Sequence, residues 1–291
     1  MMKKRKLGII GGSGLYKMDG FDQAKWKKVK TEWGKPSDEI LLAKYSGEDI
    51  CFIPRHGRGH KINPTNINFR ANIDAMKQQG VTDIISVSAV GSLKENLSPG
   101  TFVIIDQFID RTFSRIKTFF DAEIVAHVSM AKPVSKSLSK CCETVLKKLN
   151  ISNQMNGTYV VMEGPQFSTL AESNLYRSWN ADVIGMTNMP EAKLAREAEI
   201  RYCTVAMVTD YDCWHPNHEE VDVAMVIKTL TQNASNAQNM IKEVIKSYKN
   251  FSAENDPANN CLDTAIITDS KLSTKKTIKR LNYIAGRVLN K

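Results

Sequence analysis

The sequence predicts an α/β protein with a largely parallel or mixed sheet. Apolar runs of strand length alternate along the chain with segments of helical periodicity, which is typical of this fold class. Several of these runs are continuously apolar, as expected of strands that are buried on both faces. With 42% hydrophobic residues in 291 positions, the chain has enough apolar side chains for a sizeable core.

The expected elements follow one another in order along the chain. Strand-length apolar runs occupy residues 7–10, 40–43, 50–53, 83–88, 102–105, 158–162, 182–186 and 202–208. Helical periodicity extends over residues 66–79, 135–149, 170–179, 191–198, 221–246 and 274–289. Residues 252–260 are polar and rich in turn formers, which predicts a linker. We therefore expect a main domain at residues 1–250, and at 251–291 a linker and final helix that packs on the same domain or on a neighbouring subunit.

Charge and hydropathy argue against two classes of protein. The net charge of +9 comes from scattered lysines, whereas nucleic-acid binders concentrate charge and interleave aromatic residues. We therefore expect no nucleic-acid partner, although a mild positive field attracts small anions. No stretch approaches the ~20 apolar residues of a membrane span. The basic start imitates a secretory signal, but its apolar part is short and broken by glycine, which favours a first core strand.

The six cysteines suggest neither a metal site nor a disulfide framework. They form no CxxC motif and no Cys/His spacing suited to zinc, and Cys141 and Cys142 are adjacent, which is awkward for a structural disulfide. Reduced thiols in a cytoplasmic protein are the expectation.

A glycine-rich turn follows the first expected strand, in GIIGGSGLY at residues 8–16. A strand that enters such a turn brings backbone N–H groups close to an anion, and the hydroxyl of Ser13 is a suitable donor to a phosphate oxygen. A tight structural turn explains the same residues. As a dinucleotide fingerprint the turn is poor, because the third glycine position holds Lys17.

A basic, glycine-rich loop follows another strand, in IPRHGRGHKINP. It contains Arg55, His56, Arg58 and His60. Guanidinium donors fit tetrahedral oxyanions, and we expect the imidazole of His56 to add one more donor. Anion binding is favoured over the alternative of a solvated basic loop.

Two further strand ends carry small or hydroxyl-bearing residues. In SVSAVGSL, Ser88 and the backbone N–H of Ala89 are suited to complete an oxyanion cage, although small residues also permit close packing. In VIGMTNMPE, Thr187 follows a strand between Met186 and Met189. Methionines at such positions are more often core residues than ligand contacts.

The stretch VVMEGPQFSTLAES combines a carboxylate with an aromatic residue. Burying the Glu163 carboxylate at a strand end costs free energy unless the group has a partner or serves a functional site. Phe167 has an aromatic face on which a flat ligand can stack. The bland alternative is a helix that is capped by Ser168 or Thr169, with Glu172 at the capping-box position for Thr169.

Two aspartates, Asp210 and Asp212, end the last expected strand in TDYDC, with no Lys or Arg beside them. Two carboxylates this close raise each other's proton affinity, and an aspartic acid that stays protonated can pass its proton to a leaving group. A pair of exposed turn residues is the alternative explanation.

Together, these six stretches resemble the trimeric purine nucleoside phosphorylase family, in its 5′-methylthioadenosine phosphorylase branch. GGSGL, RHGxxH with SAxGSL, MEGPxFSTxAE, MTxxPE and TDYDCW all match, in register over residues 7–248. The resemblance implies one α/β domain with a twisted mixed sheet, partly barrel-like and surrounded by helices. It also implies phosphorolysis of 5′-methylthioadenosine to adenine and 5-methylthioribose 1-phosphate, in purine and methionine salvage.

The resemblance assigns roles to individual residues. Phosphate would be held by Ser13, Arg55, His56, Ser88, Ala89 and Thr187. The nucleoside would be held by Phe167, Ser168, Met186, Asp210, Asp212, Val223 and Val226, and by His127 reaching the ribose 5′ side of a neighbouring subunit. Asp210, Asp212 and His56 would be catalytic, with Asp210 as the proton donor to N7 and Asp212 accepting from the 6-amino group.

The resemblance further implies a cytoplasmic homotrimer, or a dimer of trimers, that needs no metal or organic cofactor and takes inorganic phosphate as co-substrate. The tail after residue 250 resembles bacterial members only loosely, so the preference at the 5′ position is less defined than the preference for the base. Three alternatives remain: a broader phosphorylase acting on adenosine or inosine, a dinucleotide-binding oxidoreductase, and a basic nucleic-acid binder with salt-dependent affinity.

Overall fold

The structure is a computed structural model that describes residues 5–12, 15, 20–216 and 223–290, with the backbone alone at 223–228 and 270. The strands are β1 (Leu7–Gly11), β2 (Asp22–Lys27), β3 (Ile40–Tyr45), β4 (Glu48–Pro54), β5 (Asp83–Ser92), β6 (Phe102–Asp110), β7 (Asn153–Val161), β8 (Val183–Gly185) and β9 (Arg201–Asp210). The α-helices are α1 (Phe69–Gln78), α2 (Lys136–Lys148), α3 (Leu170–Ser178), α4 (Asn188–Glu197), α5 (Val223–Ser247), α6 (Lys275–Arg280) and α7 (Asn282–Leu289).

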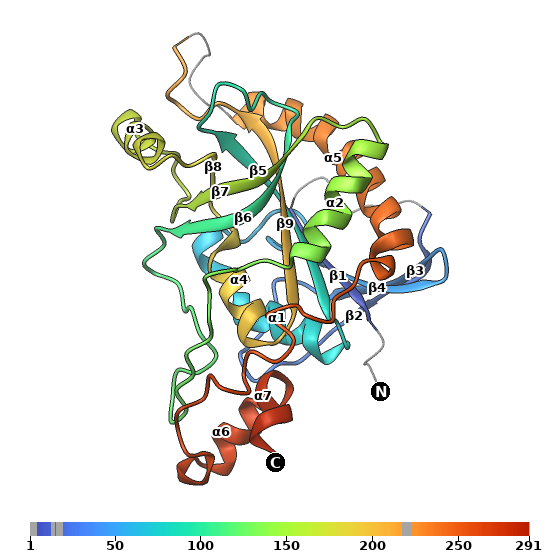
Figure 1. Cartoon of the computed structure of the whole chain (residues 1–291), viewed down its shortest axis with the longest axis vertical. Coiled ribbons are helices and arrows are strands. Elements are labelled where there is room, and N and C mark those ends of the chain that lie inside the picture. Colours follow the sequence, from blue (N-terminus) through green and yellow to red (C-terminus); the bar gives the residue numbers. More distant parts are fainter. Residues whose placement is uncertain (1–4, 13–14, 16–19, 217–222, 291) are drawn as a thin grey trace.

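The nine strands form one mixed sheet in the order β2-β3-β4-β1-β5-β8-β7-β6-β9. An additional pairing of β9 with β5 closes the last five strands into a small barrel, from which the other four extend as an open sheet (Figure 1). Strands β4, β1, β5 and β9 run parallel to one another, so their carboxyl ends meet at one edge. This edge carries most of the motifs that were singled out in the sequence.

The apolar side chains form two large clusters on opposite faces of the sheet. On β1, Ile10 belongs to one cluster and Ile9 to the other, which explains why the run is continuously apolar. Helices α1, α4 and α7 contribute to the first cluster, while α2 and α5 pack on the second. The predicted α/β class and barrel-like mixed sheet are confirmed.

Side-chain caps fix where several helices begin. Asn68 caps α1 and Ser135 caps α2, each by accepting a hydrogen bond from a backbone N–H in the first turn. At α3, Thr169 and Glu172 form the complete capping box that the sequence predicted.

Two sequence expectations about elements are wrong. The helix expected at residues 274–289 is divided into α6 and α7 at Leu281, although its apolar stripe continues across the break. Strand β2 was not expected, because it is an edge strand made mostly of exposed polar residues. All eight expected strands are present.

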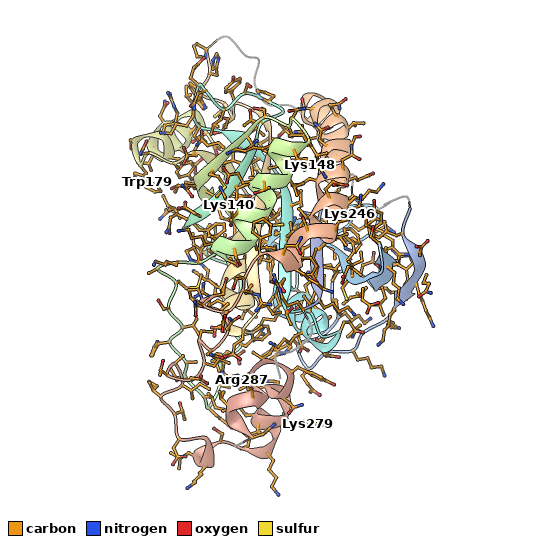
Figure 2. The ribbon with its side chains drawn as sticks, turned by 45° about the vertical axis from the view of Figure 1, so that its right-hand side comes forward. Lys140, Lys148, Trp179, Lys246, Lys279 and Arg287 are labelled. Atoms are coloured by element: carbon orange, nitrogen blue, oxygen red, sulfur yellow. The ribbon has the colours of Figure 1, made fainter. Side chains whose placement is uncertain are left out.

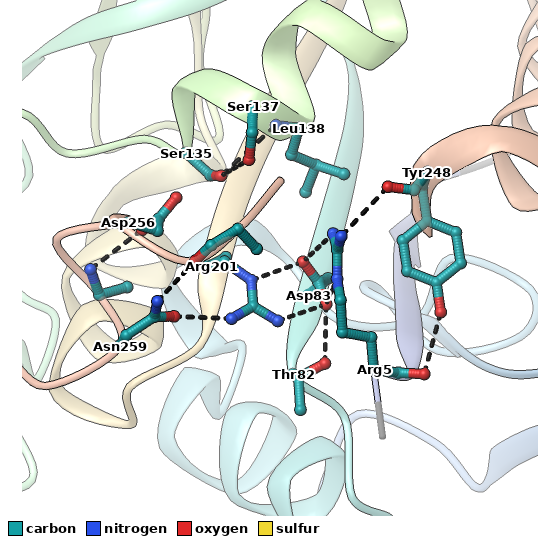
Figure 3. Close-up of polar contacts among 12 residues, drawn as sticks. Arg5, Thr82, Asp83, Ser135, Ser137, Leu138, Arg201, Tyr248, Asp256 and Asn259 are labelled. Carbon is teal, nitrogen blue, oxygen red and sulfur yellow. Dashed lines mark hydrogen bonds and ion pairs between the residues drawn. The ribbon is translucent and has the colours of Figure 1, made fainter. Parts of the chain in front are cut away.

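A buried carboxylate joins three segments of the chain at the edge of the sheet opposite the motifs. Asp83 is fully buried and accepts hydrogen bonds from the guanidinium groups of Arg5 and Arg201, at 2.7–3.3 Å (Figure 3). Arg201 also donates to Asn259, which lies in the expected linker. Arg5 donates to the backbone oxygen of Tyr248 at the end of α5.

The C-terminal segment lies beside residues 111–134, and the two form an extension of the molecule away from the sheet (Figure 1). His127 N–H donates to the Ala265 oxygen, and Arg287 pairs with Glu199 and Asp263. The tail therefore contacts the main domain of the same chain.

Basic side chains are dispersed over the surface. Lys140 and Lys148 lie on α2, Lys246 on α5 and Lys279 on α6, at the other end of the molecule (Figure 2). Lys148 and Lys246 pair with the same carboxylate, that of Glu243. Among the helices that the structure describes, none has the length and apolar composition needed to cross a membrane.

Candidate active site

A cavity of about 860 Å³ opens at the carboxyl ends of the parallel strands. Residues from the ends of β1, β4, β5 and β9 line it, together with segments that follow β7 and β8 and one face of α5. The predicted site residues that line it are Arg55, His56, Ser88, Ala89, Phe167, Met186, Thr187, Asp210 and Asp212.

Two of the predicted site residues that the structure describes do not line this cavity. Ser168 lies next to it and is buried, with its hydroxyl 3.6 Å from Met162 Sδ. His127 is exposed, on the segment that borders the tail. Ser13 and the side chains of Val223 and Val226 lie outside the described residues.

Arg55 is held below the cavity by a buried polar network. Its guanidinium makes a two-point ion pair with Glu191, at 2.8 and 3.2 Å, and also donates to Ser86 Oγ at 2.6 Å. Ser86 and Tyr202 both donate to the same carboxylate oxygen of Glu191. The positive charge of Arg55 therefore has a carboxylate partner within the protein.

In the structure, His56 presents an acceptor nitrogen in place of the donor that the sequence suggested. Nδ1 lies 2.8 Å from the carbonyl oxygen of Ile62, and because a carbonyl only accepts, Nδ1 carries the proton. Burial lowers the pKa of His56 to about 4, so the ring is neutral near pH 7 and its Nε2 is an acceptor. The ring stacks on His60 with centroids 4.2 Å apart.

Hydroxyl groups flank this histidine and arginine. Ser88 Oγ donates to Asn188 at 3.2 Å. Thr187 Oγ1 is buried and has no hydrogen-bond partner among the described residues. A hydroxyl in that position is a donor available to a ligand.

At the other end of the cavity, Asp210 and Asp212 are both buried, and neither has an ion-pair partner within the described part of the chain. Asp210 accepts from Thr209 Oγ1 at 2.6 Å and from the Asp212 N–H at 2.9 Å. Burial raises the pKa of Asp210, and it is also the largest cause of the raised pKa of Asp212. Repulsion between the two carboxylates, the cause expected from the sequence, is a smaller contribution that acts on Asp212.

The backbone places Asp212 in the left-handed region, with φ of +52°, so its side chain turns into the cavity. Its Oδ2 is buried without a hydrogen-bond partner among the described residues. Gly91 on β5 makes room for the pair, since a Cβ there would lie 2.8 Å from Asp210 Oδ1. The two aspartates are not exposed turn residues.

Comparison with known proteins identifies the family. Residues 6–246 match the phosphorylase superfamily. The chain belongs to this superfamily. Over 97% of both chains it is 56% identical to an S-methyl-5′-thioadenosine phosphorylase of Rhodospirillum rubrum. It is 51% identical to the enzyme of that name from Cereibacter sphaeroides, over 98% of this chain and 99% of the relative.

Two solved phosphorylase structures share the whole fold. A methylthioadenosine phosphorylase from an Antarctic soil metagenomic library superposes with a TM-score of 0.92 at 44% identity, covering 97% of this chain and 99% of the other. A methylthioadenosine phosphorylase from Schistosoma mansoni, in complex with adenine, gives 0.82 at 33% identity, covering 86% and 93%. The family resemblance that the sequence motifs indicated is confirmed.

The phosphorylase cavity depends on a second buried ion pair that sequence reasoning missed. Arg115 donates to the backbone oxygens of Met186 and Met189, at 2.6 and 2.7 Å, and so holds the segment that carries Thr187. It also pairs with Glu163 at 3.2 Å. No periodicity marks the loop around Arg115, and its acceptors are backbone atoms distant in sequence.

Glu163 is thus a partnered carboxylate. One oxygen accepts from Thr65 and Arg115, and the other from the N–H groups of Phe113 and Ser114. Burial raises the pKa of Glu163, but these donors outweigh it and lower the pKa to about 2. The group ties three loops together at the mouth of the cavity.

Helix α5 supplies another part of the lining that the motifs did not indicate. Its apolar stripe was predicted from the sequence, and Leu230 and Ala234 from that stripe face the cavity. Polar residues one turn apart on the same helix also line it, namely Thr231, Ser235 and Gln238. Helical spacing was the signal that would have found them.

Proposed function

We propose that this chain catalyses phosphorolysis of 5′-methylthioadenosine, giving adenine and 5-methylthioribose 1-phosphate, in purine and methionine salvage. One observation carries the proposal: a single cavity joins two buried aspartates, which have no cationic partner among the described residues, to a cluster of hydroxyl, arginine and histidine side chains. The high identity to S-methyl-5′-thioadenosine phosphorylases over nearly the whole chain supports the choice of nucleoside.

At the phosphate end, we assign Arg55, Ser88, Thr187 and the Ala89 N–H as donors, with Ser13 expected from the motif. The neutral ring of His56 offers an acceptor, which suits the oxygen of monohydrogen phosphate that carries the proton. This orientation leaves an unprotonated phosphate oxygen free to attack C1′. Caging the dianion below the ribose also stabilises the positive charge that develops on the sugar.

At the base end, Phe167 supplies a ring for stacking, with about half of its surface exposed toward the cavity mouth. As the N9–C1′ bond breaks, negative charge moves onto adenine, and protonated Asp210 donates to N7. Asp212, with its unpartnered oxygen, accepts from the 6-amino group. The proton that adenine gains equals the one that phosphate loses on forming the ester, so the reaction balances without a further acid or a cofactor.

Adenosine is the second candidate substrate. A solved Schistosoma mansoni relative is named an adenosine/methylthioadenosine phosphorylase, so both 5′ groups are accepted within the family. A 6-oxopurine is disfavoured, because a carboxylate that faces a carbonyl oxygen repels it.

We also propose a cytoplasmic homotrimer. Exposed apolar side chains on the loop after β6 and on α3, among them Phe113, Ile116 and Leu170, support association with further copies. Such association would bring His127 of one subunit toward the site of another. The free thiols of the six cysteines support a reducing compartment.

The test is adenine release from 5′-methylthioadenosine with and without phosphate, measured beside adenosine and inosine. Phosphate-dependent release, fastest with the methylthio substrate, is expected. Release that is equally fast without phosphate would indicate a hydrolase instead. No release from any of the three would contradict the proposal.

A further inference from the structure

Tyr159 on β7 presents an anomaly next to the proposed phosphate site. Its side chain is 0% exposed, yet its hydroxyl has no hydrogen-bond partner among the described residues. Burying a hydroxyl without a partner costs free energy, and native proteins rarely keep such a group without a use for it. A phenylalanine would fill the same volume at no such cost.

The hydroxyl lies directly behind the cavity wall. A Cβ at Gly185, which lines the cavity, would be 2.1 Å from Tyr159 Oη, so glycine is required there for the hydroxyl to fit. Burial raises the pKa of Tyr159, while the nearby hydroxyls of Ser88 and Thr187 and the charge of Arg55 oppose that rise. The phenol therefore lies among three residues that are assigned to phosphate.

Thr187 shares the anomaly, since its Oγ1 is also buried without a partner. Two hydroxyls that lie close together without partners can form a chain of hydrogen bonds when an anion binds. Tyr159 then donates to an oxygen of Thr187 or Ser88, and that hydroxyl turns its own proton toward the phosphate. Such chains polarise each bond, which strengthens the final donor.

We propose that Tyr159 is a positioning residue for phosphate, which acts by orienting the Thr187 and Ser88 hydroxyls. This inference rests on the proposed function and adds a residue to its phosphate site. It also predicts that the Tyr159 hydroxyl lowers the stability of the free enzyme and favours the bound state once phosphate is present.

The test is Tyr159→Phe, which removes one oxygen and preserves the ring. We expect the KM and Kd for phosphate to rise about tenfold, while the KM for the nucleoside and kcat at saturating phosphate change less than about threefold. Without phosphate, the Tm of the variant should be equal to or a few degrees above that of the wild type. The stabilisation that phosphate confers should be smaller in the variant.

Tyr248→Phe is the matched control. Tyr248 is also buried, but its hydroxyl donates to the Arg5 oxygen at 3.1 Å, at the opposite edge of the sheet (Figure 3). This variant should lose stability and keep its phosphate affinity. In a double-mutant cycle, Tyr159→Phe and Thr187→Val should be less than additive in their effect on phosphate Kd.

A phosphate Kd in Tyr159→Phe within twofold of the wild type would overturn the inference. A lower Tm of Tyr159→Phe without phosphate, together with fully additive effects of Tyr159→Phe and Thr187→Val on phosphate Kd, would also overturn it. These two results would indicate a role in packing alone. If the wild type itself releases adenine without phosphate, the proposed function fails and not the role of this residue.

Discussion

At the residue scale, Asp210 and Asp212 differ in what surrounds them. Both oxygens of Asp210 accept hydrogen bonds from the protein, whereas Asp212 keeps one buried oxygen without a partner. The unpartnered oxygen fits a fixed acceptor for a ligand amino group. Asp210 is held in place from both sides; burial raises its pKa, and the two hydrogen bonds oppose that rise. Its fixed position fits the proton transfer that we propose for it.

Asp210→Asn tests this division of roles. We expect kcat for 5′-methylthioadenosine to fall by about 10²–10⁴, because the amide cannot deliver a proton to N7. The ratio of inosine to methylthioadenosine activity should rise. Parallel assays of the two substrates measure both effects.

Asp106→Asn is the control for that experiment. Asp106 on β6 also has a raised pKa from burial but does not line the cavity, so activity should be unchanged. Full activity of Asp210→Asn on methylthioadenosine would remove Asp210 as the proton donor.

The positions of site side chains could be predicted where the residue lies at the end of an expected strand. Their hydrogen-bond and ion-pair partners could not be predicted where the partner is distant in the sequence. Asp210, Ser88 and Thr187 directly follow apolar runs, so their place at one edge could be expected. The pairing of Arg55 with Glu191 spans 136 positions, and no local pattern announces it. Tyr159 falls in the apolar run at residues 158–162, and its ring is indeed buried in the core. Only the hydroxyl group is unusual.

At the element scale, the loop between β6 and α2 is anchored by carboxylates and not by regular structure. Phe113 and Ser114 donate to Glu163, and Phe119 donates to Glu197 on α4. The chain needs these contacts because the loop has few backbone partners of its own. The loop therefore keeps its position only while Arg115 stays paired with Glu163.

Arg115→Met should destabilise the protein by about 3–5 kcal/mol, because it removes a buried guanidinium and leaves the half-buried carboxylate of Glu163 without its cation. The KM for phosphate should also rise, since the Met186 and Met189 oxygens lose the donor that holds Thr187 in place. Urea unfolding and phosphate-dependent kinetics measure the two effects.

Arg58→Met provides the comparison. Its side chain is 44% exposed and pairs with Asp38 and Glu39, so the loss should be below about 1 kcal/mol. Equal stability losses in the two variants would contradict the role given to the buried pair.

Elements were predicted where a continuous apolar run or a helical apolar stripe marks burial, and missed where the sequence has neither. The polar edge strand β2 has no apolar signal. The break between α6 and α7 is invisible because the apolar stripe continues through it. Loops that line a site have no period at all, so their contribution appears only in three dimensions.

At the scale of the whole molecule, pH acts on stability through buried carboxyls whose pKa is raised by burial. Burial, opposed by hydrogen bonds from Phe119 and Thr118 and by Arg70, raises the pKa of Glu197 to about 7, from 4.5. A carboxyl with a raised folded-state pKa contributes stability that is fully present below pH 4.5 and is lost as pH rises through 7.

Glu197→Gln should therefore become more stable relative to the wild type as pH rises from 5 to 8.5, by up to about 3 kcal/mol. Urea unfolding at several pH values measures the difference. Glu143→Gln on α2 should show no such trend across this range, because hydrogen bonds from Lys140 and Lys147 hold the pKa of Glu143 below its ordinary value. A constant difference between Glu197→Gln and the wild type would show that Glu197 does not titrate in this window.

The ion pairs around the phosphate end have one more consequence. Arg55 lines the cavity, and Arg115 and Arg58 lie on loops near it; within the described part of the chain each of the three has a carboxylate partner, so none of them adds an uncompensated positive charge there. At the proposed site, we therefore expect phosphate to be recognised mainly by hydrogen-bond donors at contact distance and hardly by a field that reaches into solvent. Dissolved salt, which screens charges over about 10 Å at 0.1 M, has little to weaken in such a site. The basic residues of the loop thus serve the internal ion pairs, and we expect the affinity for phosphate to vary little with ionic strength.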